Sequence, residues 1–344
     1  MEQRPLGETG IWVSELCLGA MMFGAMGNTD HEECVRIVHR ALDAGINFFN
    51  TADGYSSGES EQILGEALAD GRRDEAVISV KTGLVLDGNN NHGGGSRRWL
   101  NQAVEGSLRR LNTDYLDIYE LGVPDAMTDL DETLGALTDL VRAGKIRTFG
   151  TSKQPPSRLV EARALAERRG HGYFRTEEVP YSMINRAVEY DLLPTCQRLG
   201  VGVLAFSALS GGWLSGRYQD TSTARGAGSP VRARLARMEA DDPANAVKLA
   251  AVQALGDLAT DAGLTLIQLA TAFVLRHPGV TSAVIGPRKL DQIEGYLAVD
   301  GVSLSDDVLD RIDALVPPAA SIDIADTMWR LGGPALQPQN RRRN

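Results

Sequence analysis

The chain has 344 residues and a formal net charge of −10, with a sequence pI of about 5.1 and a mean hydropathy of −0.17. This acidic balance argues against nucleic acid as the main partner, because the one basic run is residues 341–343. Cys17, Cys34 and Cys196 lie far apart without metal-ligand spacing, and no apolar run approaches 18 residues. We therefore expect a reducing cytoplasm, no metal site, no signal peptide and no membrane span.

Short apolar runs alternate with amphipathic stretches from residue 15 onward, which is typical of strand–helix units. Residues 1–13, with the turn LGETG, predict a short hairpin that closes one end of the fold. Strands are then predicted at 15–18, 46–49, 76–82 and 115–121, with helices at about 30–44, 59–68, 99–111 and 130–143.

The second half continues the alternation. Strands are predicted at 145–151, 175–180, 201–206 and 281–285, with helices at 158–169, up to 199, and at 247–262, 266–276, 290–297 and 306–316. Eight units with short connections favour an α/β fold of the (β/α)8 TIM-barrel type. We expect a single domain over residues 1–344, a C-terminal tail at 316–344, and a lid or cofactor clasp in the long loop 210–244 after the seventh strand.

Two side chains at the ends of neighbouring strands suggest chemistry. Tyr55 follows the strand at 46–49, and Lys81 closes the strand at 76–82. The carboxyl ends of parallel strands meet at one edge, and a nearby ammonium group lowers the pKa of a phenol. The pair could therefore donate a proton. The alternative is a tyrosine on a surface loop and a lysine that pairs with some carboxylate.

The motif around Tyr55 resembles the aldo-keto reductases. Their pattern is Asp-Thr-Ala, a Tyr five residues after the Asp, then Gly-x-x-Glu-x-x-[Leu/Ile]-Gly; the chain reads NTADGYSSGESEQILG from Asn50. The resemblance spans about residues 4–298 and is closest to the bacterial branch related to potassium-channel beta subunits. It implies a TIM barrel that reduces aldehydes or ketones, in which Tyr55 donates the proton and Lys81 tunes the phenol.

Two catalytic positions depart from the family pattern. Asn50 stands where the family has the Asp that holds the lysine, so we expect Lys81 to lose charge stabilisation and its pKa to fall. Gly122 stands where the family has the His that positions the substrate carbonyl, and glycine has no side-chain donor. Together the two changes predict a slow enzyme.

Glu120 is a possible replacement for the missing carboxylate. It occupies a Gln position of the family and, by strand alternation, shares a face with Gly122. We hypothesise that Glu120 returns a carboxylate to the neighbourhood of Lys81. The alternative is a charge at the strand end in contact with water.

The cofactor motifs are more complete than the catalytic one. FSALSGGWLSGRY resembles the family's pyrophosphate loop, which implies phosphate contacts from Ser207, Leu209, Gly212 and Arg217. VIGPRKLDQIEGYL resembles the adenosine motif: Gly286 would meet phosphate, Arg288 the 2′-phosphate of NADP, and Gln292 the adenine. Arg288 could instead be a solvated cation at a helix start, and Tyr296 replaces the family's Asn.

Two positions near the nicotinamide are also altered. The resemblance implies that Ser152 and Tyr181 are kept, whereas Lys153 replaces an Asn and Glu178 replaces the Gln that binds the carboxamide. Lys153 and Glu178 could pair with each other, or they could weaken the site.

The sequence as a whole therefore predicts an NADPH-dependent reductase of small carbonyl compounds. Two rivals remain open: a sensor that binds NADPH with negligible turnover, and a structural barrel that binds no nucleotide. The substrate and the oligomeric state are not set by the sequence.

Overall fold

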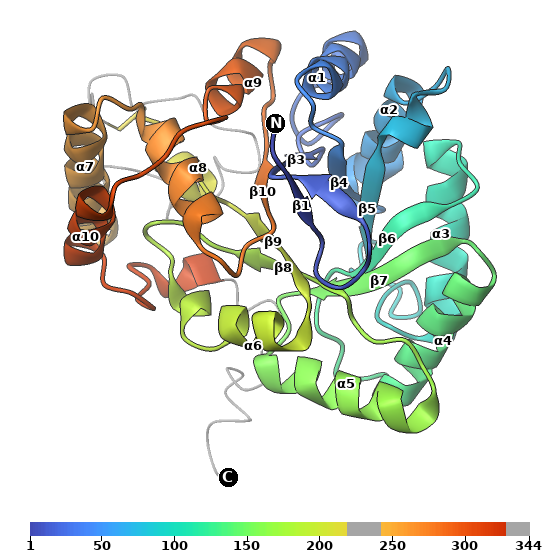
Figure 1. Cartoon of the computed structure of the whole chain (residues 1–344). Helices are drawn as coiled ribbons and strands as arrows, with labels where there is room; N and C mark the ends of the chain where they lie inside the picture. The colour runs from blue at the N-terminus through green and yellow to red at the C-terminus, as the bar shows by residue number, and fades with distance from the viewer. Residues whose placement is uncertain (219–241, 328–344) are drawn as a thin grey trace.

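Eight parallel strands close into a barrel, as the alternation of strands and helices predicted (Figure 1). The structure, a computed structural model, describes residues 1–218 and 242–327. Strand β10 pairs with β3 and completes the circle. The barrel strands are β3 (Leu16–Gly19), β4 (Phe48–Ala52), β5 (Val77–Thr82), β6 (Leu116–Leu121), β7 (Ile146–Ser152), β8 (Thr176–Pro180), β9 (Gly202–Phe206) and β10 (Ser282–Ile285).

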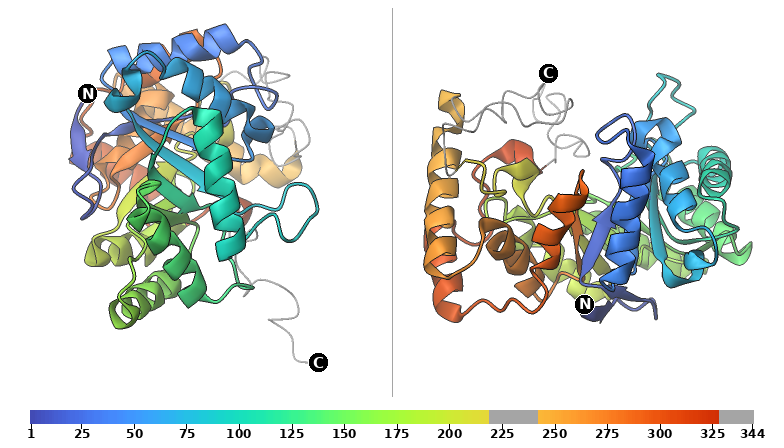
Figure 2. Two further views of the ribbon diagram at one scale, coloured as in Figure 1. Left: turned by 90° about the vertical axis from the view of Figure 1, so that its right-hand side faces the viewer. Right: turned by 90° about the horizontal axis from the view of Figure 1, so that it is seen from above.

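Helices surround the barrel, and their bounds lie within a few residues of the predicted ones (Figures 1 and 2). They are α1 (His31–Asp43), α2 (Glu59–Ala67), α3 (Arg97–Leu111), α4 (Leu130–Arg142), α5 (Pro156–Arg169), α6 (Leu192–Leu199), α7 (Ala246–Asp261), α8 (Leu266–Arg276), α9 (Leu290–Leu297) and α10 (Asp306–Leu315). Several begin at a side-chain cap: Asp30 accepts from the Glu33 amide, and Thr265 and Gln268 form a capping box. These caps satisfy amide groups that have no partner inside the helix.

The predicted N-terminal hairpin is confirmed. Strands β1 (Gln3–Pro5) and β2 (Trp12–Ser14) pair antiparallel. Their apolar side chains cover the end of the barrel where the strands begin. Leu6 and Val13 of the hairpin join Cys17, Phe48, Ile118 and Leu204 of the barrel strands in a buried cluster, called here the lower layer.

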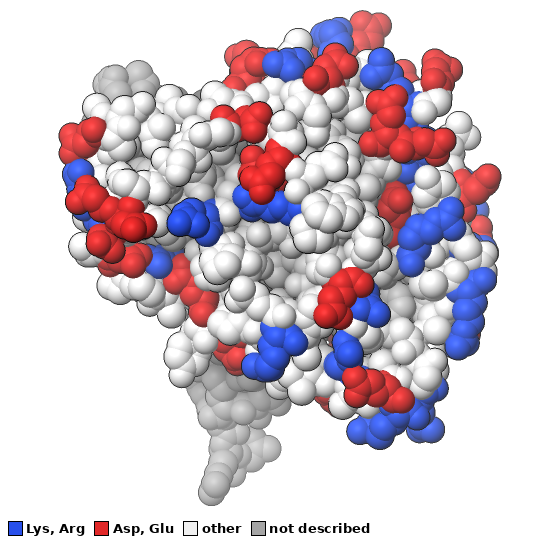
Figure 3. Space-filling model, in the orientation of Figure 1, with Lys and Arg blue, Asp and Glu red and all other residues white. Residues whose placement is uncertain are grey.

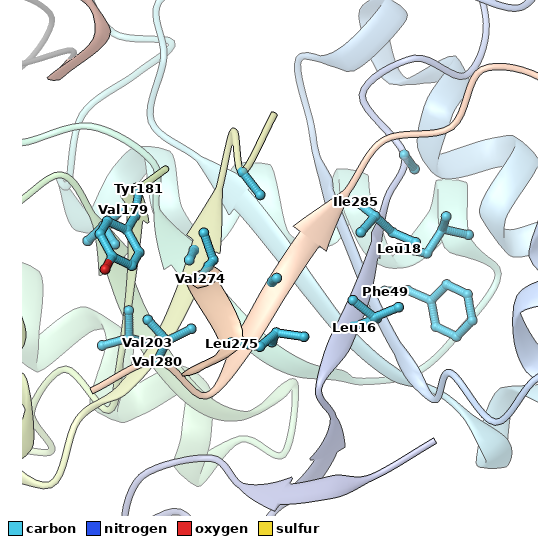
Figure 4. Close-up of a cluster of buried hydrophobic side chains, with 14 of the residues drawn as sticks. Leu16, Leu18, Phe49, Val179, Tyr181, Val203, Val274, Leu275, Val280 and Ile285 are labelled. Atoms are coloured by element: carbon cyan, nitrogen blue, oxygen red, sulfur yellow. The ribbon is translucent and has the colours of Figure 1, made fainter. Parts of the chain in front are cut away.

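A second apolar shell lies between the strands and the helices. Leu16 and Leu18 alternate with Cys17 along β3, so they point out of the barrel where Cys17 points in. Figure 4 shows both leucines with Phe49, Val203 and Ile285 of other barrel strands, together with Val274 and Leu275 of α8. Both faces of the strands are therefore buried, as expected for parallel sheets.

Part of the expected periphery falls outside the described residues. Only 210–218 and 242–244 of the predicted lid and 316–327 of the predicted tail are described. The described part of the tail is tied to the barrel: Arg186 donates to the Val316 carbonyl at 2.7 Å, and Lys248 bonds to the Asp326 carboxylate. This segment also accepts a hydrogen bond from Asn185 at the Asp326 carbonyl, at 3.0 Å.

The surface carries both charge signs. On the face shown in Figure 3, acidic and basic side chains are interspersed. No single described helix is long and apolar enough to cross a membrane. The segment Pro243–Asp261 and α8 pass that test together only as a pair bent by 93°.

Candidate active site

Strand alternation carries polar side chains into the barrel directly beyond the lower layer. Two residues after Phe48 and Ile118, on the same strand faces, come Asn50 and Glu120. The strand register places Lys81 opposite Glu120. These three residues and Glu178 of β8 form what we call the upper layer. All four are buried: Asn50 is 2% exposed, Glu120 0%, Lys81 7% and Glu178 4%.

Lys81 is the centre of the upper layer. Its ammonium forms an ion pair with the Glu178 carboxylate, with 2.9 Å between Nζ and Oε2. The same ammonium donates to Oδ1 of Asn50. Asn50 in turn donates from Nδ2 to Oε2 of Glu178 at 3.3 Å. Lysine, amide and carboxylate thus form a closed triangle of interactions across β4, β5 and β8.

This triangle corrects one expectation. Asn50 was expected to leave Lys81 without charge stabilisation and with a lowered pKa. Burial does act to lower the pKa of Lys81, but the Glu178 carboxylate, with smaller contributions from Tyr55 and Glu120, raises that pKa above its ordinary value. Glu178 therefore supplies the negative charge that Asn50 lacks.

Tyr55 lies beside this group. It begins the short helix η1 (Tyr55–Gly58), in which Ser56 and Ser57 adopt positive φ angles of 49° and 58°. The turn is held because Ser56 Oγ donates to the Phe23 carbonyl at 2.7 Å and accepts from the Met26 amide at 3.0 Å. The Lys81 ammonium lies 5.2 Å from the centre of the Tyr55 ring. The strand ends thus bring the predicted tyrosine and lysine together.

The phenol of Tyr55 is held in its protonated form. Burial raises the pKa of Tyr55 above its ordinary value, and the charge of Lys81 acts in the opposite direction without outweighing burial. At neutral pH the side chain is therefore a hydroxyl that can donate a proton.

Glu120 lies inside the barrel, but its closest bond is not to Lys81. Its Oε1 accepts from Thr176 Oγ1 at 2.7 Å, and Oε2 has no hydrogen-bond partner among the described residues. Gly150 makes room for this bond, because a β-carbon there would lie 1.8 Å from Thr176 Oγ1. Burial, and then the charge of Glu178, raises the pKa of Glu120 to about 7. The ion pair with Lys81 belongs to Glu178, so the geometry gives Glu120 at most a secondary influence on Lys81.

Gly122 lies against the stem of Lys81. A β-carbon at this position would lie 3.3 Å from Lys81 Cβ and 3.1 Å from the Thr82 carbonyl oxygen. A larger residue would therefore press on the lysine. The five histidines bond to groups away from the upper layer: His31 to Glu59, His39 to the Ala67 carbonyl, His92 to Asp87, His171 to Asp131, and His277 to the Gly279 amide.

The residues predicted to face the nicotinamide form a chain of hydrogen bonds. Ser152 donates to the Glu178 carbonyl at 3.0 Å, and Lys153 donates to Ser152 Oγ at 2.6 Å. Lys153 has a positive φ of 62°. Burial lowers the pKa of Lys153 and the charge of Glu178 opposes this. Of the two sequence-based alternatives, a direct pair between Lys153 and Glu178 is not favoured, because the Glu178 carboxylate is bound to Lys81.

Tyr181 lies outside the barrel interior. It follows β8 by one residue and is 1% exposed. Its ring packs against Phe273 and His277, at 5.8 Å from each ring centre, and its hydroxyl donates to Glu189 at 2.6 Å. Figure 4 shows it in the shell between strands and helices. This position separates Tyr181 from the Lys81 triangle.

The loop after β9 is a series of tight turns. Ser207, Ser210 and Gly212 have φ angles of 61°, 45° and 100°. The amide of Gly212 donates to the Leu209 carbonyl at 2.7 Å, so this group is used inside the turn. Arg217 is held by a bond from Nε to Ser215 Oγ at 3.0 Å. Among the predicted phosphate contacts of this loop, Arg217 is the one with a positively charged side chain.

The loop after β10 adjoins it, because β9 and β10 are paired. Gly286 is exposed, and a β-carbon built there would meet nothing within 4 Å, so its backbone is open to solvent beside the half-buried Arg288. Gln292 accepts from the Arg288 amide at 2.9 Å, and Asn28 donates to the Arg288 carbonyl at 2.7 Å. An exposed glycine backbone next to an arginine leaves room for a phosphate group.

Sequence reasoning missed the role of Glu178. The signal was present: position 50 has lost a carboxylate relative to the family pattern, and position 178 has gained one. Glu120 was considered as the replacement because it stands at a Gln position of the family pattern and shares a strand face with Gly122. Glu178 lies three strands away in the barrel order, and only closure of the barrel brings it to the lysine.

Comparisons with known proteins agree with this fold. Residues 15–317 match the model of the aldo/keto reductase family. An uncharacterized oxidoreductase, YrpG, of Bacillus subtilis (strain 168) is 34% identical over 92% of this chain and 96% of its own length. A probable voltage-gated potassium channel subunit beta of Oryza sativa subsp. japonica is 33% identical over 92% of this chain and 97% of its own. Norsolorinic acid reductase B of Aspergillus parasiticus is 30% identical over 88% of this chain and 81% of its own length.

Proposed function

Because the chain belongs to the aldo/keto reductase family, we propose that this oxidoreductase reduces the carbonyl group of an aldehyde or ketone with NADPH. The arrangement that carries the proposal is the protonated Tyr55 beside the charged Lys81 at the carboxyl ends of β4 and β5. In barrels of this kind, catalytic groups lie at that end of the strands.

The residues divide the reaction between them. NADPH, when bound, supplies the hydride that reaches the carbonyl carbon. Tyr55 donates its phenolic proton to the carbonyl oxygen, which would otherwise become a free alkoxide. Lys81 stabilises the phenolate that remains, since an ammonium group favours the charged form of a nearby phenol.

The nucleotide preference follows from the phosphate side. Arg288 follows β10 and is the cation expected to meet the 2′-phosphate, which NADPH carries and NADH lacks, whereas Arg217 after β9 is expected at the pyrophosphate that both nucleotides share. Guanidinium binds phosphate with two parallel hydrogen bonds, so we propose a preference for NADPH over NADH.

We also propose slow turnover, for one of the two reasons inferred from the sequence. Gly122 offers no side chain to orient the carbonyl, which we expect to reduce turnover by roughly two to three orders of magnitude. The other reason, a missing counter-charge for Lys81, no longer applies because Glu178 provides it.

Three apolar side chains suggest which probe to use. Leu84, Val85 and Leu86 are exposed in the loop after β5. Leu86 covers Gly54, because a β-carbon there would lie 2.4 Å from Leu86 Cδ1. Tyr55 is the next residue, so an aromatic aldehyde is a suitable first substrate.

The test is a titration with NADPH and with NADH, followed by nicotinamide fluorescence and then by cofactor oxidation with aromatic aldehydes. Tyr55→Phe is the control, since it keeps the ring and removes the proton donor. We expect NADPH to bind more tightly than NADH, and Tyr55→Phe to bind NADPH normally while its turnover falls roughly 10²–10⁴-fold.

The rivals give different results in the same experiment. Tight NADPH binding without turnover on any aldehyde would favour a cofactor-binding sensor. Absence of nucleotide binding by the parent protein would leave a structural barrel and end the reductase proposal.

A further inference from the structure

Positions 50 and 178 carry an exchange of charge. In the family pattern described above, a carboxylate stands at the first position and an amide at the second. Here the amide is Asn50 and the carboxylate is Glu178. The two side chains touch, since Asn50 Nδ2 lies 3.3 Å from Glu178 Oε2, and both bond to the ammonium of Lys81.

We propose that Glu178 is the positioning residue that holds Lys81 charged and in place beside Tyr55, with Asn50 as a neutral bridge between lysine and glutamate. This rests on the proposed carbonyl reduction. The family motif assigned Glu178 to the cofactor contacts, whereas this proposal assigns it to the group that supports proton donation by Tyr55.

The amide at position 50 matches a carboxylate at position 178. Asn50 accepts from Lys81 with its oxygen and donates to Glu178 with its nitrogen, so both ends of the amide are satisfied. An aspartate at position 50 would instead place a second carboxylate about as far from Glu178 as the Asn50 amide is now. Two carboxylates so close do not both ionise, and one would take up a proton.

Glu120 does not compete for this role in the structure. Its Oε1 is engaged by Thr176 at 2.7 Å, whereas Glu178 meets the lysine directly at 2.9 Å. Burial and the charge of Glu178 raise the pKa of Glu120, which favours its protonated form.

Several titratable groups act on the Lys81 pair from the surrounding elements. They are Tyr55 of η1, Cys17 of β3, Glu120 of β6, Lys153 after β7 and Glu177 of β8. Because Glu178 makes the direct contact, its removal is expected to lower the pKa of Lys81 more than removal of any other carboxylate.

The test is a charge exchange in four proteins: the parent, Glu178→Gln, Asn50→Asp, and the double variant Asn50→Asp/Glu178→Gln. Glu120→Gln is the matched control, since it makes the same change in the neighbouring buried glutamate. For each protein we would measure NADPH affinity, kcat, KM for an aromatic aldehyde, and the alkaline limb of the pH–rate profile.

Glu178→Gln should move the alkaline limb to lower pH by about one unit and lower kcat roughly ten-fold or more, because Lys81 then loses its proton more easily. Asn50→Asp should also lower kcat, because it crowds two carboxylates around one lysine. The double variant should regain a kcat within about three-fold of the parent, and Glu120→Gln should move the alkaline limb to lower pH by clearly less than Glu178→Gln does.

The proposal is overturned if folded Glu178→Gln keeps the parent kcat and pH profile, or if the double variant is no better than the single ones. Circular dichroism and thermal unfolding establish that each variant is folded. If the parent shows no turnover, the reductase proposal fails by itself. The pKa of Lys81, measured by NMR in the parent and in Glu178→Gln, then decides the role of Glu178 without catalysis: a lower value in the variant supports it, and equal values overturn it.

Discussion

The lower and upper layers fill the same barrel with opposite chemistry. The lower layer consists of apolar side chains sealed by the hairpin, whereas the upper layer buries Lys81 and Glu178 as an ion pair. Burial of the apolar layer stabilises the fold directly. Removing charges from water is unfavourable, and their attraction offsets this only when geometry is good. The contrast assigns stability to the hairpin end and the proposed chemistry to the charged end.

The largest effect should come from Lys81→Met in the upper layer. We expect turnover to fall roughly 10²–10⁴-fold, because the phenolate of Tyr55 loses its stabilising charge. Urea unfolding should also show a loss of about 3–5 kcal/mol near pH 8, because the Glu178 carboxylate is left buried and unpaired. At pH 5 the loss should be smaller, since an unpaired buried carboxyl can take up a proton. Equal losses at both pH values would contradict the ion pair.

Phe48→Ala tests the lower layer. Phe48 is fully buried beneath Asn50 on the same strand face, and its truncation should destabilise the protein by about 3–5 kcal/mol at any pH. The alkaline limb of the pH–rate profile should not move, provided that the assay temperature is well below unfolding. A shift of that limb would mean that the layers are not separate.

Glu120→Gln should have the smallest effect, and one that depends on pH. The pKa of Glu120 is raised from an ordinary value of 4.5 to about 7, so the folded state favours its protonated form. The stabilising contribution is present in full below pH 4.5 and is lost as pH rises through about 7. The difference in free energy of unfolding between the variant and the parent should therefore shift in favour of the variant by on the order of 3 kcal/mol from pH 4 to pH 8. Urea unfolding at the two pH values measures this, and parallel stability curves would contradict the raised pKa.

Sequence reasoning was accurate where local rules decide the outcome. The alternation of apolar runs predicted all eight barrel strands and the hairpin, because buried parallel strands and amphipathic helices leave periodic patterns. Strand ends also predicted that Tyr55 and Lys81 would meet. Each of these results depends on neighbours in sequence or on adjacent strands.

The rest depended on contacts across the barrel. Glu178 could not be matched to Lys81 from strand order alone, since β8 and β5 are not paired. The same limit applies to Glu120, whose position was predicted on the correct face but whose bond to Thr176 needs the room left by Gly150. Tyr181 followed the family motif in sequence, yet its ring packs between strand and helices.

The most direct measurement is the pKa of the Lys81 ammonium group in the parent protein, by NMR of lysines labelled at Cε. The chain has few lysines, and Lys81→Met identifies the signal. The account predicts that Lys81 titrates above its ordinary value of 10.5, because the Glu178 carboxylate outweighs burial. A Lys81 pKa below that ordinary value would show that Lys81 is buried without a working counter-ion, and would contradict the upper layer described above.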